Sequence, residues 1–339
     1  MKKLIISLFC AVILLVGCNK KDVNKDTKSE TSTETKKETT AEKTDNAEVE
    51  IKDAHGTVKV KKNPKKVVAL DNRTFDTLSA WGIKPVAVPK DVMPPKSVFV
   101  KDDSIKNIGN HREPNLELIA AENPDLVIVG QRFVKHYKAI KELVPNATVI
   151  DLNIDVSEKA EKSGENLVNG LKNSTEALGK IFGKEKEAKE LNDKFDKAIE
   201  NAKKNYKGEK VMSILVTGGK IRFSAPHSGR VWGPMYEIFG WKPALEINKS
   251  SSNHKGDDIS VEAIAQSNPD WLFVLDRDAA TSKGNEGNSA KEVLEKSEAL
   301  KNIKAIKENK IIYAPNDTYT NESIQTYLKL FDDIAKAFK

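Results

Sequence analysis

The sequence predicts an α/β protein made of two Rossmann-like lobes, which are joined by one long α-helix and enclose a ligand cleft. The main observation is an internal repeat, because NLELIAAENPDLVIVGQR at 115–132 returns as SVEAIAQSNPDWLFVLDR at 260–277. The two segments are identical at eight of eighteen aligned positions. In each, a short helix ends at Asn-Pro-Asp, since proline cannot continue it. The fully apolar run that follows is typical of a strand buried on both faces of a parallel sheet.

A second pair of similar segments supports a duplication. TFDTLSAWGIKP follows Arg73 and VWGPMYEIFGWKP follows Arg230. The chain is therefore expected to contain two copies of one strand–loop–helix unit. Between the copies, residues 157–208 carry apolar side chains at helical spacing and contain no proline, which predicts the connecting helix. Gly179 and Gly183 are the positions where a break or bend is expected.

The N-terminal segment has the organisation of an exported protein. Residues 1–17 contain two lysines and an apolar core that is too short for a permanent membrane helix, which predicts a signal peptide. Residues 18–48 consist almost entirely of small polar and charged side chains, so they predict a disordered tether. Cys10 falls in the signal peptide and Cys18 begins the tether, so no cysteine remains in the body for a disulfide or a thiolate metal site.

The body of the chain is expected to begin near residue 49, where VEIKDAHGTVKV predicts a β-hairpin. We expect the N-terminal lobe over 49–156 and the C-terminal lobe over 209–339. The net charge of +6 arises from 56 basic and 50 acidic residues that are mixed along the chain. Because there is no basic block with interleaved aromatic residues, nucleic acid is not an expected partner.

Arginine is scarce, since only six of the 56 basic residues are arginine. A guanidinium group donates in a plane to anions and stacks on aromatic rings, which lysine cannot do. Arg132, Arg230 and Arg277 follow predicted strands, and open α/β sheets bind ligands beyond the carboxyl ends of their strands. We therefore expect these three side chains to face one cleft and bind an anion. The remaining arginines fit a cleft or an ordinary surface position equally well: Arg73, Arg112 and Arg222.

His254 and Tyr319 lie in polar loops that would also face this cleft. A neutral imidazole and a phenolate suit Fe(III) with open coordination positions. The alternative is a solvated histidine and a partly buried tyrosine. The five histidines form no close metal-binding pair, which argues against a zinc or manganese site made wholly of protein. No nucleophile motif, Walker loop or dinucleotide fingerprint is present, so neither an enzyme nor a resident cofactor is expected.

Taken together, these features resemble the solute-binding lipoproteins of iron–siderophore ABC importers over about residues 49–339, a class III periplasmic-binding-protein-like family. Within that family, the sequence is most similar to the catecholate-siderophore branch. Four motifs carry this resemblance: Arg132 after NPDLVIVG, Arg230 in the SGR segment, His254 in the NHKG loop and Arg277 in VLDR. The resemblance implies that Arg132, Arg230 and Arg277 hold catecholate oxygens. It also implies that His254 and Tyr319 lie near the iron, which they ligate directly in some members.

The resemblance further implies that Leu-Val-Gly-Cys is a lipobox and that the mature chain starts at a lipidated Cys18. The protein would then be extracytoplasmic and anchored to the outer face of the cell membrane, in the arrangement of Gram-positive bacteria. An ABC permease is the implied partner, and the repeat-equivalent Glu117 and Glu262 would dock on it, one from each lobe. Stabilisation of two helix N-termini is the alternative role of these glutamates.

The expected function is therefore capture of a ferric siderophore by a monomeric binding protein, followed by delivery to the permease. A ferric tris-catecholate is trianionic, and three guanidinium groups would balance its charge. Two alternatives stay open. One is the binding of haem or cobalamin, for which Met93 and Met235 are candidate axial ligands. The other is an extracellular α/β hydrolase that acts on an anionic substrate.

Overall fold

The computed structural model describes residues 47–248, 250–252, 254–281 and 289–339. The expected signal peptide, Cys18 and nearly all of the expected tether lie outside these ranges. The described chain begins with the expected hairpin, formed by β1 (Glu48–Asp53) and β2 (Gly56–Lys61). Gly56 closes its turn with φ of 125°, a backbone conformation that favours glycine.

The N-terminal lobe is built on a five-stranded parallel sheet with the order β5-β4-β3-β6-β7. Its strands are β3 (Val67–Ala69), β4 (Ala87–Val88), β5 (Lys106–Asn107), β6 (Leu126–Val129) and β7 (Thr148–Asp151). Its α-helices are α1 (Phe75–Ala80), α2 (Val98–Lys101), α3 (Leu116–Ala121) and α4 (Tyr137–Leu143). Two 3₁₀ turns complete the lobe, η1 (Lys90–Val92) and η2 (Gln131–His136).

The C-terminal lobe repeats this plan with the parallel order β10-β8-β11-β12, and β9 pairs with β8 in the antiparallel sense. Its strands are β8 (Lys210–Thr217), β9 (Lys220–Phe223), β10 (Lys242–Pro243), β11 (Trp271–Asp276) and β12 (Ile311–Tyr313). Its helices are α7 (Gly233–Phe239), α8 (Val261–Ser267), α9 (Arg277–Thr281), α10 (Ala290–Glu295), α11 (Lys304–Lys307) and α12 (Ile324–Ala337).

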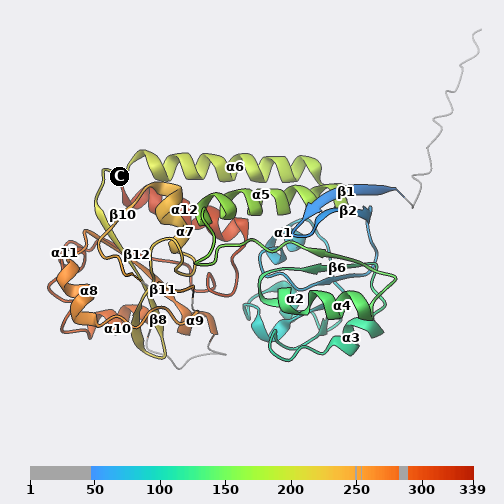
Figure 1. The fold of residues 1–339 in the computed structure, drawn as a ribbon, viewed down its shortest axis with the longest axis horizontal. Coiled ribbons are helices and arrows are strands. Elements are labelled where there is room, and N and C mark those ends of the chain that lie inside the picture. The colour runs from blue at the N-terminus through green and yellow to red at the C-terminus, as the bar shows by residue number, and fades with distance from the viewer. Residues whose placement is uncertain (1–46, 249, 253, 282–288) are drawn as a thin grey trace, which may run out of the picture. The chain divides into compact units, whose positions relative to one another are not determined.

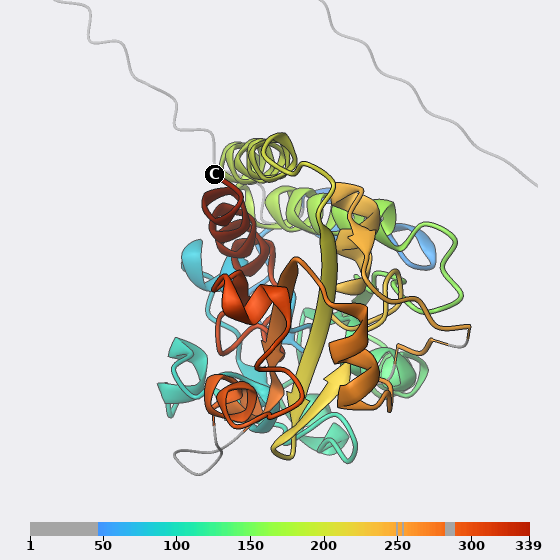
Figure 2. The same ribbon diagram turned by 90° about the vertical axis from the view of Figure 1, so that its left-hand side faces the viewer.

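Both faces of the C-terminal sheet are covered by helices (Figure 2). Side chains of β11 alternate between two cores, so that Phe273 and Leu275 belong to one and Leu272 and Val274 to the other. Every residue of β11 is buried, and the same holds for β6 in the N-terminal lobe. The continuous apolar runs of the sequence thus correspond to central strands, as expected for parallel sheets with two covered faces.

The repeated Asn-Pro-Asp motif has a structural role in both lobes. Asn123 and Asn268 adopt positive φ values of 46° and 41°, a conformation that asparagine tolerates better than most residues, just beyond the ends of α3 and α8. The Asp125 carboxylate then accepts hydrogen bonds of 2.8 Å from the backbone N–H groups of Lys65 and Lys66. The Asp270 carboxylate accepts one of 2.8 Å from Lys210 N–H. The motif therefore ends a helix and ties the next strand to its neighbour.

A long helix joins the lobes, but the helical region expected over 157–208 contains two helices. They are α5 (Ser163–Phe182) and α6 (Glu185–Lys204), separated at Gly183, which has φ of 63°. The second of the two expected weak points, Gly183, is therefore the actual break, because glycine is the usual residue for the left-handed end of a helix. The helices pack side by side along both lobes (Figure 1).

The helix α5 is the connection between the two cores. Leu167 and Leu171 in its first half pack in the C-terminal core, whereas Leu178, Ile181 and Phe182 near its end pack in the N-terminal core. None of the helices in the described ranges is both long and apolar enough to cross a membrane.

Candidate functional site

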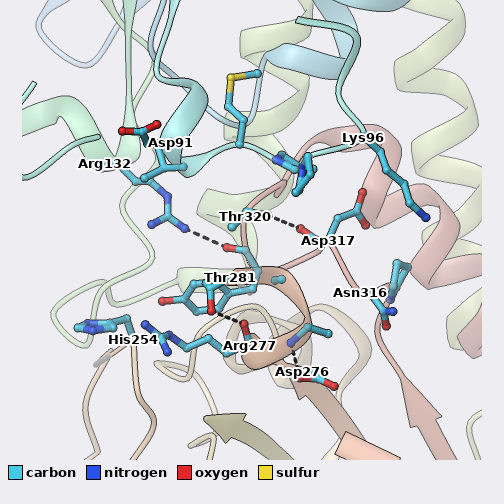
Figure 3. A pocket seen from close by; sticks show the side chains of 18 of the residues that line it. Asp91, Lys96, Arg132, His254, Asp276, Arg277, Thr281, Asn316, Asp317 and Thr320 are labelled. Atoms are coloured by element: carbon cyan, nitrogen blue, oxygen red, sulfur yellow. Dashed lines mark hydrogen bonds between the residues drawn. The ribbon is translucent and has the colours of Figure 1, made fainter. Parts of the chain in front are cut away.

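A cavity of about 1560 Å³ is lined by residues of both lobes. All five predicted ligand-binding residues line it, namely Arg132, Arg230, His254, Arg277 and Tyr319. Its charged lining is mainly cationic, with seven lysines and arginines and three aspartates: Lys90, Lys96, Arg112, Arg132, Arg230, Arg277, Lys329, Asp91, Asp276 and Asp317. In Figure 3, Arg132, Arg277 and His254 lie on one side of the view. This lining favours an anionic ligand.

The three predicted arginines converge on one aromatic ring. Their guanidinium carbons lie 5.5 Å (Arg132), 4.5 Å (Arg230) and 5.3 Å (Arg277) from the centroid of the Tyr319 ring. Arg132 is in η2 directly after β6, and Arg277 begins α9 directly after β11. The repeat therefore places equivalent arginines from the two lobes at the same point, as the sequence predicted. Arg230 reaches it from the turn before α7.

Each guanidinium is anchored by one terminal nitrogen. Arg132 Nη2 and Arg230 Nη2 donate to the backbone oxygen of Tyr319 at 3.0 and 3.1 Å. Arg277 Nη1 donates to Thr217 Oγ1 at 3.0 Å. Within the described part of the chain, the other terminal nitrogen of each arginine has no hydrogen-bond partner. The site is thus preorganised, because each planar group is held in place while it keeps donors for a ligand.

The cavity arginines repel one another, and Glu322 offsets this repulsion only in part. Burial, together with the positive charge of Arg230, lowers the pKa of Arg132 to about 10. This pKa still lies far above neutral, so Arg132 carries its positive charge and faces the partly desolvated cavity beside two further guanidinium groups. A bound anion would relieve this repulsion and gain hydrogen bonds from the free donors.

Glu322 is the carboxylate beneath this cluster, and the sequence analysis did not identify it. Its side chain is 2% exposed and accepts a hydrogen bond from Arg230 Nη2 on Oε1. Its Oε2 accepts from Gln131 Nε2 at 2.9 Å and from Arg73 Nη2 at 3.3 Å. Burial alone would raise the pKa of Glu322, but the charges of Arg230 and Arg73 outweigh burial and hold the pKa below its usual value. The carboxylate is therefore ionised at neutral pH.

Two imidazoles line the cavity in the neutral state. Burial, followed by the charges of Arg277 and Arg230, lowers the pKa of His254. Burial and the charge of Arg132 lower the pKa of His111, which the sequence analysis did not single out, to about 4. A neutral imidazole offers a lone pair to a metal ion. In the described residues, no group of three or more His, Cys, Asp or Glu side chains is arranged to hold a metal by itself.

The other arginines and the two methionines considered in the sequence differ in whether they reach the cavity. Arg112 lines the cavity, Arg73 is buried behind it, and Arg222 pairs with Asp258 away from it. Of the two methionines considered for haem, Met93 lines the cavity, whereas Met235 is fully buried in the C-terminal core.

Glu117 and Glu262 lie outside the cavity lining, at equivalent positions in the first turns of α3 and α8. Both are exposed. The two helices are capped by other residues, since Asn115 and Ser260 accept hydrogen bonds from the backbone N–H groups of Leu118 and Ala263. The glutamates are therefore not needed as caps and are free to meet a partner.

Comparison with known proteins agrees with this architecture. The petrobactin-binding protein YclQ of Bacillus subtilis is 34% identical over 271 residues, which cover 79% of each chain. Its crystal structure matches with a TM-score of 0.72 at 30% identity, over 86% of this chain and 99% of that chain. The ferric-anguibactin-binding protein FatB of Vibrio anguillarum is 28% identical, over 84% of this chain and 85% of its own.

A further solved structure supports the same two-lobed fold. The siderophore-binding protein BauB, bound to two molecules of acinetobactin and ferric iron, matches with a TM-score of 0.74 at 25% identity, over 86% of this chain and 99% of that chain. The family described as Periplasmic binding protein matches residues 67–318, which include both sheets and every predicted cavity arginine. This match covers most of the chain, and with the similarity to YclQ it establishes the family: the chain belongs to the periplasmic binding proteins.

Proposed function

We propose that this protein captures a ferric siderophore outside the cell membrane and delivers it to the permease of an ABC importer. The main observation in support of this proposal is that Arg132, Arg230 and Arg277 converge in a large cavity between the lobes. The names of the relatives YclQ and FatB, which are siderophore-binding proteins, support this proposal. The family consists of binding proteins, which argues against the hydrolase alternative.

Catecholate oxygens suit the cavity better than neutral ligands do. Each catecholate brings two negative charges to Fe(III), so a tris-catecholate complex is anionic, whereas a tris-hydroxamate complex is near neutral. Each of the three guanidinium groups keeps a free planar donor, and their combined positive charge exceeds the single negative charge of Glu322, so an anionic ligand gains both hydrogen bonds and charge balance. We therefore propose that catecholate siderophores are the preferred class.

We further propose that His254 completes the coordination of iron when a siderophore leaves positions open. Its imidazole is exposed at the cavity and neutral, as a ligand to Fe(III) must be. The hydroxyl of Tyr319 is the second candidate ligand. Tyr319 as a whole is only 3% exposed, and its backbone oxygen anchors two of the arginines, so Tyr319 supports the cluster whether or not it reaches iron.

Calorimetric titration of the purified body, residues 47–339, tests the proposed function. The panel contains a ferric tris-catecholate, a neutral ferric hydroxamate, haemin and cobalamin, with the iron-free catecholate as the control. We expect the ferric tris-catecholate to bind most tightly, because it alone carries enough negative charge to engage all three arginines. Tightest binding of haemin or cobalamin would establish the alternative, and the absence of heat with both ferric siderophores would refute the proposal.

We propose that Cys18 anchors the protein to the membrane. Replacing Cys18 with alanine should move the protein from the membrane fraction into the medium, because acyl chains buried in the bilayer supply the attachment. Fractionation followed by immunoblotting measures this. Cys10 provides the matched control, since it lies in the expected signal peptide and Cys10→Ala should leave the protein in the membrane fraction. Full membrane retention of the Cys18→Ala variant would show that the attachment is of another kind.

A further inference from the structure

A buried ion pair connects the two lobes directly behind the cavity. Arg73 follows β3 of the N-terminal lobe, and Glu322 lies between β12 and α12 of the C-terminal lobe. Their side chains are each 2% exposed, and Arg73 Nη2 lies 3.3 Å from Glu322 Oε2. Neither residue lines the cavity. The pair is therefore placed to act on a ligand only through other residues.

Glu322 makes that connection through two residues that do line the cavity. Its Oε1 accepts from Arg230, and its Oε2 accepts from Gln131 as well as from Arg73. Arg73 is held in turn by the backbone oxygen of Ile154, to which its Nη1 donates at 3.4 Å. The ion pair thus holds Arg230 from behind, and because it is buried it is screened much less by dissolved salt than a surface pair.

The charges of this assembly decide how cationic the cavity is. Glu322 pairs with both Arg73 and Arg230, so its single negative charge offsets only part of the positive charge of Arg73 and the three cavity arginines. Without the charge of Glu322, the positive charge of Arg73 would add to that of the cavity. Without Arg73, the negative charge of Glu322 would act on Arg230 and Arg132 and would cancel more of the attraction for an anion.

We propose that Arg73 and Glu322 are a positioning pair that sets the ligand charge which the cavity prefers, without touching the ligand. The inference rests on the proposed function, because it specifies which ferric complexes the same site selects. Selectivity between ligands of different charge would then depend on two kinds of residue: the arginines that contact the ligand, and the ion pair buried between the lobes. Because Arg73 and Glu322 carry opposite charges, removing each charge should shift the ligand preference in opposite directions, and this distinguishes an electrostatic role from a structural one.

The test measures charge preference, defined as the Kd of a neutral ferric hydroxamate divided by the Kd of a ferric tris-catecholate. Glu322→Gln removes a negative charge behind the cavity, which makes the cavity more cationic, and should raise this ratio about tenfold. Arg73→Gln removes a positive charge, which makes the cavity less cationic, and should lower the ratio about tenfold. The double variant restores neutrality and should return the ratio to that of the wild type. A merely structural pair would instead shift both single variants in the same direction.

Charge-retaining variants separate charge from stability. Arg73→Lys and Glu322→Asp should lower the melting temperature but leave the ratio within about twofold of the wild type. If a single glutamine variant does not fold, the double variant and Glu322→Asp still decide the matter, because a shifted ratio in either one overturns the proposal. A wild-type protein that binds neither ferric complex contradicts the proposed function itself. If the wild type prefers the ferric tris-catecholate but both glutamine variants shift the Kd ratio in the same direction, only this inference is contradicted.

Discussion

Replacing Arg277 with alanine should weaken the binding of a ferric tris-catecholate by about ten- to hundredfold, and should affect a neutral ferric hydroxamate much less. The estimate follows from the value of a hydrogen bond to a charged group, about 1.5–3 kcal/mol. Arg277 is anchored by one terminal nitrogen and keeps the other for the ligand. Calorimetry with both complexes at one fixed ionic strength measures the difference, and Arg132→Ala and Arg230→Ala should behave alike.

The chain offers a matched control for this experiment. Arg222 pairs with Asp258 and does not line the cavity, so Arg222→Ala should leave both affinities unchanged. Arg277→Lys should lie between the wild type and the alanine variant, because lysine keeps the charge but loses the planar pair of donors. Equal, small effects of Arg277→Ala on the anionic and the neutral complex would show that charge matching does not govern binding.

Reversing the charge of both Glu117 and Glu262 should abolish uptake of the siderophore by cells and leave the affinity of the purified protein unchanged. The two side chains are exposed, occupy equivalent positions in the two lobes and lie outside the cavity. Paired acidic points of this kind fit basic sites on a permease with two related halves. Uptake of radioactive iron by cells and calorimetry on the purified Glu117→Lys/Glu262→Lys variant measure the two quantities separately.

A second double variant controls for the change in net charge. Glu142 and Glu298 are exposed glutamates, one in each lobe, that pair with the neighbouring surface lysines Lys138 and Lys301. Glu142→Lys/Glu298→Lys should therefore leave uptake intact. If Glu117 and Glu262 serve only their helix N-termini, their reversal would instead lower the melting temperature while uptake continued, because such charges contribute about 0.3–1 kcal/mol. Lost ligand affinity would also argue against docking.

The lobes and the cavity arginines were predictable because their signals are local. An apolar run bounded by Asn-Pro-Asp predicts a buried strand, and the residue that follows such a strand lies at the ligand-binding edge of the sheet. Arg132 and Arg277 satisfy both conditions, so their convergence followed from the repeat alone. The break at Gly183 was only half predictable, because apolar spacing is helical on both sides of it and no local feature decides between a bend and an end.

The supporting groups were not predictable, because their partners are distant in sequence. Arg73 and Glu322 are 249 positions apart, and nothing in their local sequence distinguishes a buried ion pair from two surface residues. The burial that depresses the pKa of His111 is likewise created by the fold. Sequence patterns thus located the groups that face the ligand, whereas the groups behind them depend on the tertiary structure.

The helix α5 makes the two lobes interdependent in folding. The first half of α5 packs in the C-terminal core. The second half, which comes later in the sequence, completes the core of the N-terminal lobe with Leu178, Ile181 and Phe182. Burial of each such side chain is worth about 1.5–3 kcal/mol, so together they approach the net stability of an ordinary domain. A fragment that stops before α5 would leave this core open. The lobes are therefore separate in architecture but form one cooperative unit, which must be synthesised through α5 before even its first half can be stable.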